Sequence, residues 1–210
     1  MLTVMITGGI GSGKSTLRRM MCDKGAVSID LDAIASTLLE NEQQMINELA
    51  DEFGPQILDE QGAVIRSELA AVAFSSDAAT RAMNAITFPY IQREATEYLL
   101  NVHCTPRTNA PVLVVEVPLL TEMPDFAELA DEVIAVEVPV VTRLARCVER
   151  GMDAEDAIAR MNHQATDAER ATLATVICDN SGLQEDLRAW VDAWWSERVG
   201  GNTPQLLLGE

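Results

Sequence analysis

The chain has 210 residues, 48% of them hydrophobic, and its 15 lysines and arginines against 33 acidic residues give a formal net charge of -18. This length suits one substantial core with an attached insertion or lid, and no apolar run approaches the roughly 18 to 20 residues of a membrane-spanning helix. A surface this acidic should repel nucleic acid and anionic membranes, so we expect neither as a partner.

The first predicted elements are a strand, a glycine-rich loop and a helix. Residues 2–7 are a short, β-prone apolar run, and a helical pattern extends from Lys14 to about Lys24. Residues 26–29 are typical of a second strand, which ends at Asp30. Because no basic leader precedes the first strand, we expect no signal peptide and a cytoplasmic location.

A helical block is predicted next. From about Ala33 to Leu100 the pattern is amphipathic and helical, with breaks expected at Gly54-Pro55, Gln61-Gly62 and Phe88-Pro89. Strands resume only after this block, which therefore interrupts a sheet.

Three further apolar segments complete the predicted sheet. Pro111 to Val117 is apolar and β-branched, Glu132 to Val138 repeats the pattern, and Ala174 to Cys178 is a weaker instance. Between the last two, residues 143 to about 164 are expected to be helical. Strands that alternate with helices predict an α/β fold with a parallel sheet.

These elements predict a core, an insertion, a lid and a tail. The core comprises residues 1–32 and 101–199, with the lid at about 143–164. The helical insertion covers residues 33–100. Residues 200–210 are predicted to be a flexible tail.

The glycine-rich loop matches the phosphate-binding pattern G-x-x-x-x-G-K-[ST]. Gly8, Gly13, Lys14 and Ser15 occupy its fixed positions, and the glycines let backbone N–H groups turn toward phosphate oxygens. In this pattern the lysine neutralises the β- and γ-phosphates and the serine hydroxyl ligates magnesium, so we expect ATP and Mg²⁺ as cofactors. The predicted nucleotide contacts in this segment are Gly9, Gly11, Ser12, Gly13, Lys14, Ser15 and Thr16.

A small kinase is the favoured class, because the chain has no guanine-reading Asn-Lys-x-Asp motif and is short for a motor. The alternative for the loop is a glycine-rich turn that binds no nucleotide. Phosphoryl transfer also needs a group that orients or deprotonates the acceptor. Asp30 and Asp32 follow the second strand, and we predict that Asp32 contacts the acceptor hydroxyl. The alternative is that one of the two only caps the next helix.

Other charged residues carry two interpretations each. Glu116 ends the third strand and is either an acid near the magnesium or a strand-end carboxylate that faces solvent or a helix terminus. Arg146 and Arg150 are predicted to close over the triphosphate as lid groups. Their alternative is a solvated helix in which they pair with neighbouring acids.

With these residues in place, the chain resembles the dephospho-CoA kinase family over nearly its whole length. The resemblance rests on a succession of segments in the family's order: residues 7–15, Ile29-Asp30-Leu31-Asp32, Arg66-Ser67-Glu68-Leu69, Pro89-Tyr90-Ile91, Val117-Pro118-Leu119-Leu120, Arg160-Met161-Asn162-His163-Gln164, Glu169-Arg170 and Asp179-Asn180-Ser181-Gly182. It implies a P-loop NTPase fold and transfer of the ATP γ-phosphate to the ribose 3′-hydroxyl of dephospho-CoA, which gives coenzyme A and ADP.

The resemblance also implies roles for single residues and makes the insertion the substrate-binding part. Asp32, Lys14 and Arg146 would be catalytic, and Arg150 a second lid arginine. The implied substrate contacts are Asp32, Arg66, Pro118 and Leu119, and the implied magnesium ligand is Ser15.

Three positions depart from the family's pattern. Ser36 stands where the family usually has an arginine, Ala70 where it often has another, and Phe88-Pro89 replaces the usual His-Pro. All three lose polar or positive groups on the acceptor side that the resemblance implies, although Arg66, Arg81 or Arg93 could compensate. Two alternatives therefore stay open: a kinase of the same fold that acts on another nucleoside or nucleotide, and a regulatory protein that binds ATP but has lost acceptor recognition.

Overall fold

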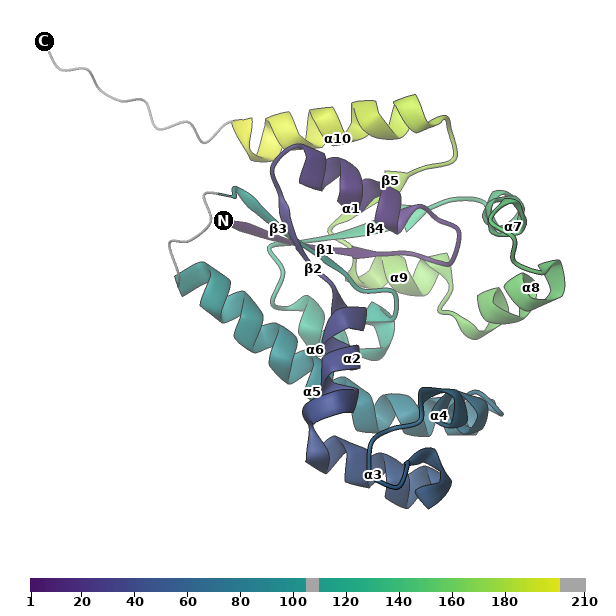
Figure 1. Cartoon of the computed structure of the whole chain (residues 1–210). Helices are drawn as coiled ribbons and strands as arrows, with labels where there is room; N and C mark the ends of the chain where they lie inside the picture. Colours follow the sequence, from purple (N-terminus) through teal and green to yellow (C-terminus); the bar gives the residue numbers. More distant parts are fainter. Residues whose placement is uncertain (105–109, 201–210) are drawn as a thin grey trace, which may run out of the picture. The chain divides into compact units, whose positions relative to one another are not determined.

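The computed structural model describes residues 1–104 and 110–200, which belong to two compact units (Figure 1). The first unit comprises Met1–Ile29 and Asn109–Glu210, and the second comprises Asp30–Thr108. The helical block predicted over residues 33–100 thus falls inside the second unit. The tail predicted over residues 200–210 lies, beyond Gly200, outside the described residues.

The first unit is built on a five-stranded sheet in the order β2-β3-β1-β4-β5, and all paired strands are parallel. The strands are β1 (Leu2–Thr7), β2 (Val27–Ile29), β3 (Val112–Glu116), β4 (Glu132–Glu137) and β5 (Val176–Asp179). Each overlaps the apolar run that predicted it, because strands buried on both faces of a parallel sheet are almost continuously apolar. The predicted α/β fold is confirmed.

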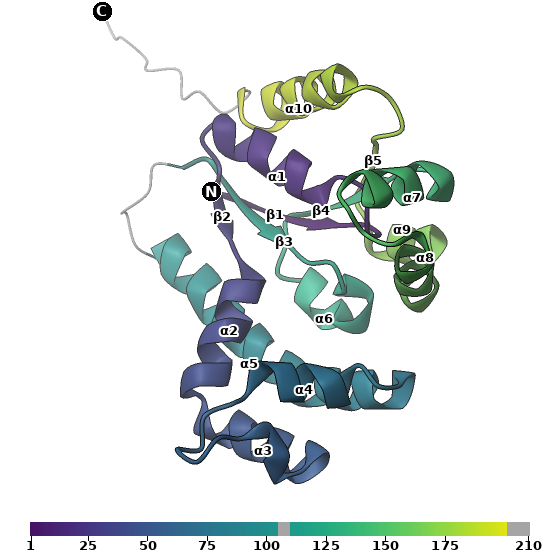
Figure 2. The ribbon, with the colours of Figure 1, turned by 45° about the vertical axis from the view of Figure 1, so that its right-hand side comes forward.

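Helices cover both faces of this sheet (Figures 1 and 2). On one face lie α1 (Lys14–Asp23) and α10 (Gln184–Arg198), and on the other lie α6 (Pro124–Ala127) and α9 (Asp167–Leu173). The core under α1 and α10 contains buried side chains of both helices and of the strands, among them Val4, Ile6, Leu17, Met21, Val114, Ile134 and Trp194. Burial of each large apolar side chain contributes about 1.5 to 3 kcal/mol, so this core fixes the start of α1 against the sheet.

The stretch from residue 143 to 164, predicted to be helical, is divided in two. It belongs to α7 (Val140–Glu149) and α8 (Ala154–His163). The chain turns between them because the carboxylate of Asp153 accepts the N–H groups of Glu155 and Asp156 and so starts a new helix. Both views place α7 beside the loop that joins β1 to α1 (Figure 2).

The second unit is helical in its described part. It contains α2 (Leu31–Asn41), α3 (Gln43–Phe53), η1 (Pro55–Ile57), α4 (Arg66–Ala73) and α5 (Asp77–Cys104). Their apolar faces form a separate core from buried side chains that include Leu38, Met45, Leu49, Ile57, Leu69 and Tyr90. Within residues 1–104 and 110–200, no helix has the combination of length and apolarity that a membrane span requires.

The break predicted at Phe88-Pro89 is wrong, because α5 continues through Pro89. Proline inside a helix removes a backbone hydrogen bond and costs about 3 kcal/mol. Here α5 packs against α2, α3 and α4, and beyond the proline it buries Tyr90, Ala95 and Leu99. The Tyr90 hydroxyl also donates to Glu48 at 2.8 Å. Packing on both sides of Pro89 therefore outweighs its local cost.

Candidate functional site

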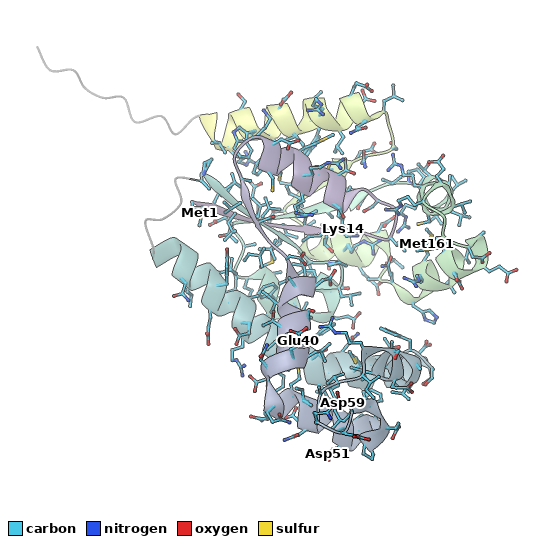
Figure 3. The ribbon with its side chains drawn as sticks, in the orientation of Figure 1. Met1, Lys14, Glu40, Asp51, Asp59 and Met161 are labelled. Carbon is cyan, nitrogen blue, oxygen red and sulfur yellow. The ribbon has the colours of Figure 1, made fainter. Side chains whose placement is uncertain are left out.

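The predicted phosphate-binding loop joins the end of β1 to the start of α1 (Figure 3). It lies at the carboxyl end of the parallel strands, where α/β proteins bind ligands. Gly13 is the N-cap residue of α1 and has a φ of 99°, a conformation that residues with a Cβ rarely adopt. Within the described residues no side chain caps this helix end, so its N–H groups and helix dipole can bind an anion.

Lys14 begins α1 and turns back onto the loop. Its Nζ donates to the carbonyl oxygen of Gly8 at 2.8 Å and to that of Gly9 at 3.2 Å, and only 8% of the residue is exposed. Burial lowers the pKa of Lys14 to about 8; Glu116 opposes this shift, and Arg170, Arg150 and Arg143 add to it. A buried ammonium that is also close to three guanidiniums is strongly stabilised by a bound anion.

Ser15 and Glu116 form a hard-oxygen pair beside the loop. The Ser15 hydroxyl donates to Glu116 Oε1 at 2.9 Å, while Arg18 Nε donates to the other carboxylate oxygen at 3.2 Å. Glu116 thus faces the first turn of α1, as the helix-terminus alternative expects, and is also next to the predicted magnesium ligand Ser15. Hydroxyl and carboxylate oxygens are the groups by which proteins hold Mg²⁺, often through water, so this pair fits the expected ion.

The start of α1 is also contacted by the segment after β5 and by α7. Asn180 Nδ2 donates to the Ser12 carbonyl oxygen at 2.7 Å, and Arg146 Nη2 donates to the Asn180 carbonyl oxygen at 3.0 Å. Arg150 Nε donates to the Arg146 carbonyl oxygen at 3.1 Å. In the described part of the chain, neither arginine forms the ion pair with a neighbouring acid that the alternative interpretation required.

Besides Asn180, sequence reasoning gave no site role to four residues that contact or flank the loop. Gln164 accepts the Ile10 N–H at 2.7 Å. Arg143 and Arg170 are only 6% and 2% exposed, and both pair with Asp167. Arg143 was visible on a predicted helix, and Gln164 and Arg170 were among the residues of the family resemblance. No sequence signal could show that two of the four are buried arginines.

In the second unit, the structure separates the two aspartates that the sequence could not. Asp30 Oδ1 accepts the N–H groups of Asp32 and Ala33 at 3.0 and 3.1 Å, so Asp30 is the N-cap of α2. The predicted alternative role as a cap thus belongs to Asp30. Asp32 lies in the first turn with an exposed side chain, where it is available to a ligand.

Arg66 forms a small polar cluster within the same unit. Its Nη2 donates to Ser36 Oγ at 2.6 Å and to Glu40 Oε1 at 2.7 Å. Ser36 is thus contacted by a guanidinium, although the family's usual arginine is missing at this position. The other two departures differ: Ala70 is exposed on α4, and Phe88 is half-buried in α5.

The predicted site residues are divided between the units. The structure brings together the loop residues, Arg146 and Arg150 in the first unit, where Pro118 is exposed and Leu119 half-buried just after β3. Asp32 and Arg66 belong to the second unit.

Comparison with known proteins identifies one family. A family model described as dephospho-CoA kinase matches residues 2–186. The dephospho-CoA kinase of Corynebacterium diphtheriae is 39% identical over 196 residues, which cover 93% of this chain and 96% of the relative. That of Thermobifida fusca is 38% identical over 198 residues, which cover 94% and 96%.

Solved structures give the same fold. TT1252 from Thermus thermophilus is 30% identical with a TM-score of 0.73 and covers 93% of this chain and 97% of its own. A dephospho-CoA kinase from Campylobacter jejuni, 24% identical, has a TM-score of 0.69 with coverage of 96% and 98%. A shikimate kinase from Acinetobacter baumannii, 15% identical with a TM-score of 0.52 and coverage of 96% and 95%, shares the fold alone.

Proposed function

The chain belongs to the dephospho-CoA kinase family, and from this premise we propose that it transfers the terminal phosphoryl group of ATP to the ribose 3′-hydroxyl of dephospho-CoA, giving coenzyme A and ADP. The observation that carries the proposal is the inward-turned Lys14 on a phosphate-binding loop whose helix end has no side-chain cap in the described residues. We place the reaction in the cytoplasm.

The loop and Lys14 bind and neutralise the triphosphate. Phosphoryl transfer depends mainly on positioning and charge neutralisation, because negative charge spreads over the oxygens of the transferred group. Backbone N–H groups at the start of α1 bind phosphate oxygens, and Lys14 leaves its carbonyl acceptors to reach the β- and γ-phosphates. Arg146, already held near Gly13 through Asn180, adds a guanidinium that pairs with phosphate.

Ser15 is the residue that would hold Mg²⁺, with Glu116 orienting the Ser15 hydroxyl through the hydrogen bond that it accepts. Bound there, Mg²⁺ would neutralise part of the negative charge of the phosphate oxygens. Arg18 holds Glu116 in place through its other carboxylate oxygen and also donates to Ser28 at 3.2 Å.

Asp32 is the proposed group that accepts the proton of the acceptor hydroxyl. Asp30 already caps α2, which leaves the Asp32 carboxylate free of that role. A carboxylate that accepts the hydroxyl proton raises the nucleophilicity of the oxygen as it attacks phosphorus. Arg66 supplies the guanidinium beside Ser36 and would pair with the pyrophosphate of the acceptor, and Pro118 and Leu119 contribute further acceptor contacts.

The test is acceptor-dependent ADP formation with ATP and Mg²⁺. Dephospho-CoA, AMP, adenosine and other nucleosides are compared at equal concentration, and the product is identified by mass. We expect conversion of dephospho-CoA to coenzyme A at a rate that exceeds every other acceptor. Faster conversion of another nucleoside or nucleotide, or ATP binding without any transfer, would contradict the proposal.

A further inference from the structure

Arg143 is a charged side chain that is buried without a matching set of partners. It lies on α7, and the residue is 6% exposed. Among the described residues its Nε hydrogen has no acceptor. In the described part of the chain, the carboxylate that pairs with it is that of Asp167, whose Oδ2 lies 3.7 Å from Arg143 Nη2, too far for a hydrogen bond. Buried charges are normally paired and hydrogen-bonded, so this guanidinium lacks an anion.

Arg170 is the main partner of the Asp167 carboxylate. It is 2% exposed, and its guanidinium binds Asp167 and the carbonyl oxygen of Ala165. Its Nε also lacks an acceptor within the described part of the chain. Within the described residues, the two buried guanidiniums thus share the Asp167 carboxylate. The exposed Glu169, whose carboxylate accepts from Thr166, also interacts electrostatically with Arg170. Arg143 therefore has no carboxylate of its own in this part of the chain. An unbalanced buried charge destabilises a fold unless a ligand balances it.

The side chains of this cluster abut the phosphate-binding loop at Gly9, and the backbone of Arg143 abuts it at Gly11. A Cβ at Gly9 would overlap Arg143 Nη1 and would lie 3.4 Å from Arg170 Nη2. The Gly9 carbonyl oxygen is also one of the two acceptors of Lys14 Nζ. Arg143 and Arg170 therefore flank the part of the loop that the Lys14 ammonium contacts, and both help to lower the pKa of Lys14. Glu116, the carboxylate that acts on Lys14 in the opposite direction, is already paired with Arg18.

We propose that Arg143, backed by Arg170 and Asp167, binds the terminal phosphoryl group of the nucleoside triphosphate at Gly9. The inference rests on the proposed function for the identity of the nucleotide. Lys14 reaches the β- and γ-phosphates, and the guanidinium beside Gly9 adds a forked donor that suits a phosphate with several free oxygens. A diphosphate lacks this terminal group, so Arg143 distinguishes ATP from ADP.

Equilibrium binding of ATP and of ADP, each with Mg²⁺ and without acceptor, tests the proposal. We expect Arg143→Gln to weaken ATP binding by about 10- to 100-fold and ADP binding by less than about threefold, because one charge-assisted contact is lost only from the triphosphate. Arg143→Lys keeps the charge without the fork and should fall between the two. Arg188→Gln, which removes an exposed arginine on α10, is the matched control and should change neither affinity.

Equal weakening of ATP and ADP binding would make Arg143 a structural support of the loop and overturn the proposal, as would unchanged ATP binding. A rise in the KM for dephospho-CoA with an unchanged ratio of ATP to ADP affinity would assign the cluster to the acceptor instead. Thermal melting of each variant shows that it is folded, and Arg143→Lys serves if Arg143→Gln is not. The binding experiments contain no acceptor, so failure of the wild-type protein to phosphorylate dephospho-CoA would not contradict the role of Arg143.

Discussion

Buried charged side chains flank the loop of the first unit, whereas the polar cluster of the second unit is exposed. In the first unit Lys14, Arg143 and Arg170 are 8%, 6% and 2% exposed. Lys14 contacts the loop, and the two arginines share Asp167. In the second unit the side chains of Arg66 and Glu40 are 53% and 64% exposed. Charges fixed by burial are preorganised for a ligand and cannot easily rearrange. An exposed ion pair contributes only about 0 to 1 kcal/mol, so a substrate can replace one partner at little cost.

This difference matches the two parts of the proposed reaction. The triphosphate needs a rigid set of donors, because catalysis depends on charges already in place as the phosphoryl group moves. The acceptor needs residues that can exchange their present partners for the substrate. Substitutions in the first unit should therefore alter ATP binding and transfer, and those in the second unit should alter acceptor use.

The largest expected effect comes from Asp32. Asp32→Asn keeps the size of the side chain but removes the proton acceptor, so kcat should fall by about 10²- to 10⁴-fold. ATP affinity should stay within about twofold, since the loop residues are untouched. Steady-state kinetics and equilibrium ATP binding measure the two quantities.

Asp30→Asn is the matched control for that variant. Asparagine is as good an N-cap as aspartate, so α2 keeps its start and kcat should change by less than about threefold. Unchanged turnover in Asp32→Asn would remove Asp32 from the mechanism. An equal loss of kcat in both variants would show that the loss comes from weaker helix capping and not from missing proton transfer.

The second expected effect is a pH dependence that belongs to Lys14. Its pKa of about 8 in the free protein means that the charged form, which binds phosphate, is lost as pH rises through 8. The kcat/KM for ATP should be constant below this pH and fall about tenfold per pH unit above it. Bound phosphate raises the pKa of Lys14, so kcat at saturating ATP should persist to higher pH.

Lys14→Arg tests this assignment, because arginine stays protonated over the whole range. The variant should be slower at neutral pH, yet its kcat/KM should lack the fall above pH 8. A wild-type profile that is flat to pH 9.5, or a fall that survives in the variant, would show that another group titrates.

Much of the first unit could be predicted from the sequence because its signals are local. The β-branched runs gave the strands, and the spacing of Gly8, Gly13, Lys14 and Ser15 gave the loop, since neither depends on distant residues. Arg143 shows the limit of such local prediction. Its position on a helix could be predicted, but its burial against Gly9 depends on how α7 packs. That packing involves contacts between distant residues and cannot be inferred from one sequence.

The errors have the same origin. Pro89 predicted a helix break from its own chemistry, whereas packing along α5 keeps the helix continuous. Asp30 and Asp32 could not be separated, because alternation along an extended chain puts both on one side. The cap geometry distinguishes them. The sequence also left Glu116 undecided, since its hydrogen bond to Ser15 joins residues 101 positions apart.

The smallest expected effects concern the exposed pair in the second unit, and their signs carry the information. Arg66→Ala should raise the KM for dephospho-CoA about tenfold, with kcat and ATP affinity little changed, because one charge-assisted contact is lost. Glu40→Gln frees Arg66 from its present partner and should lower that KM about twofold, while the free energy of unfolding changes by less than about 1 kcal/mol. Acceptor titrations and chemical denaturation measure these quantities. If both variants raised the KM, the pair would serve the packing of α2 against α4, and the guanidinium beside Ser36 would have no part in binding the acceptor.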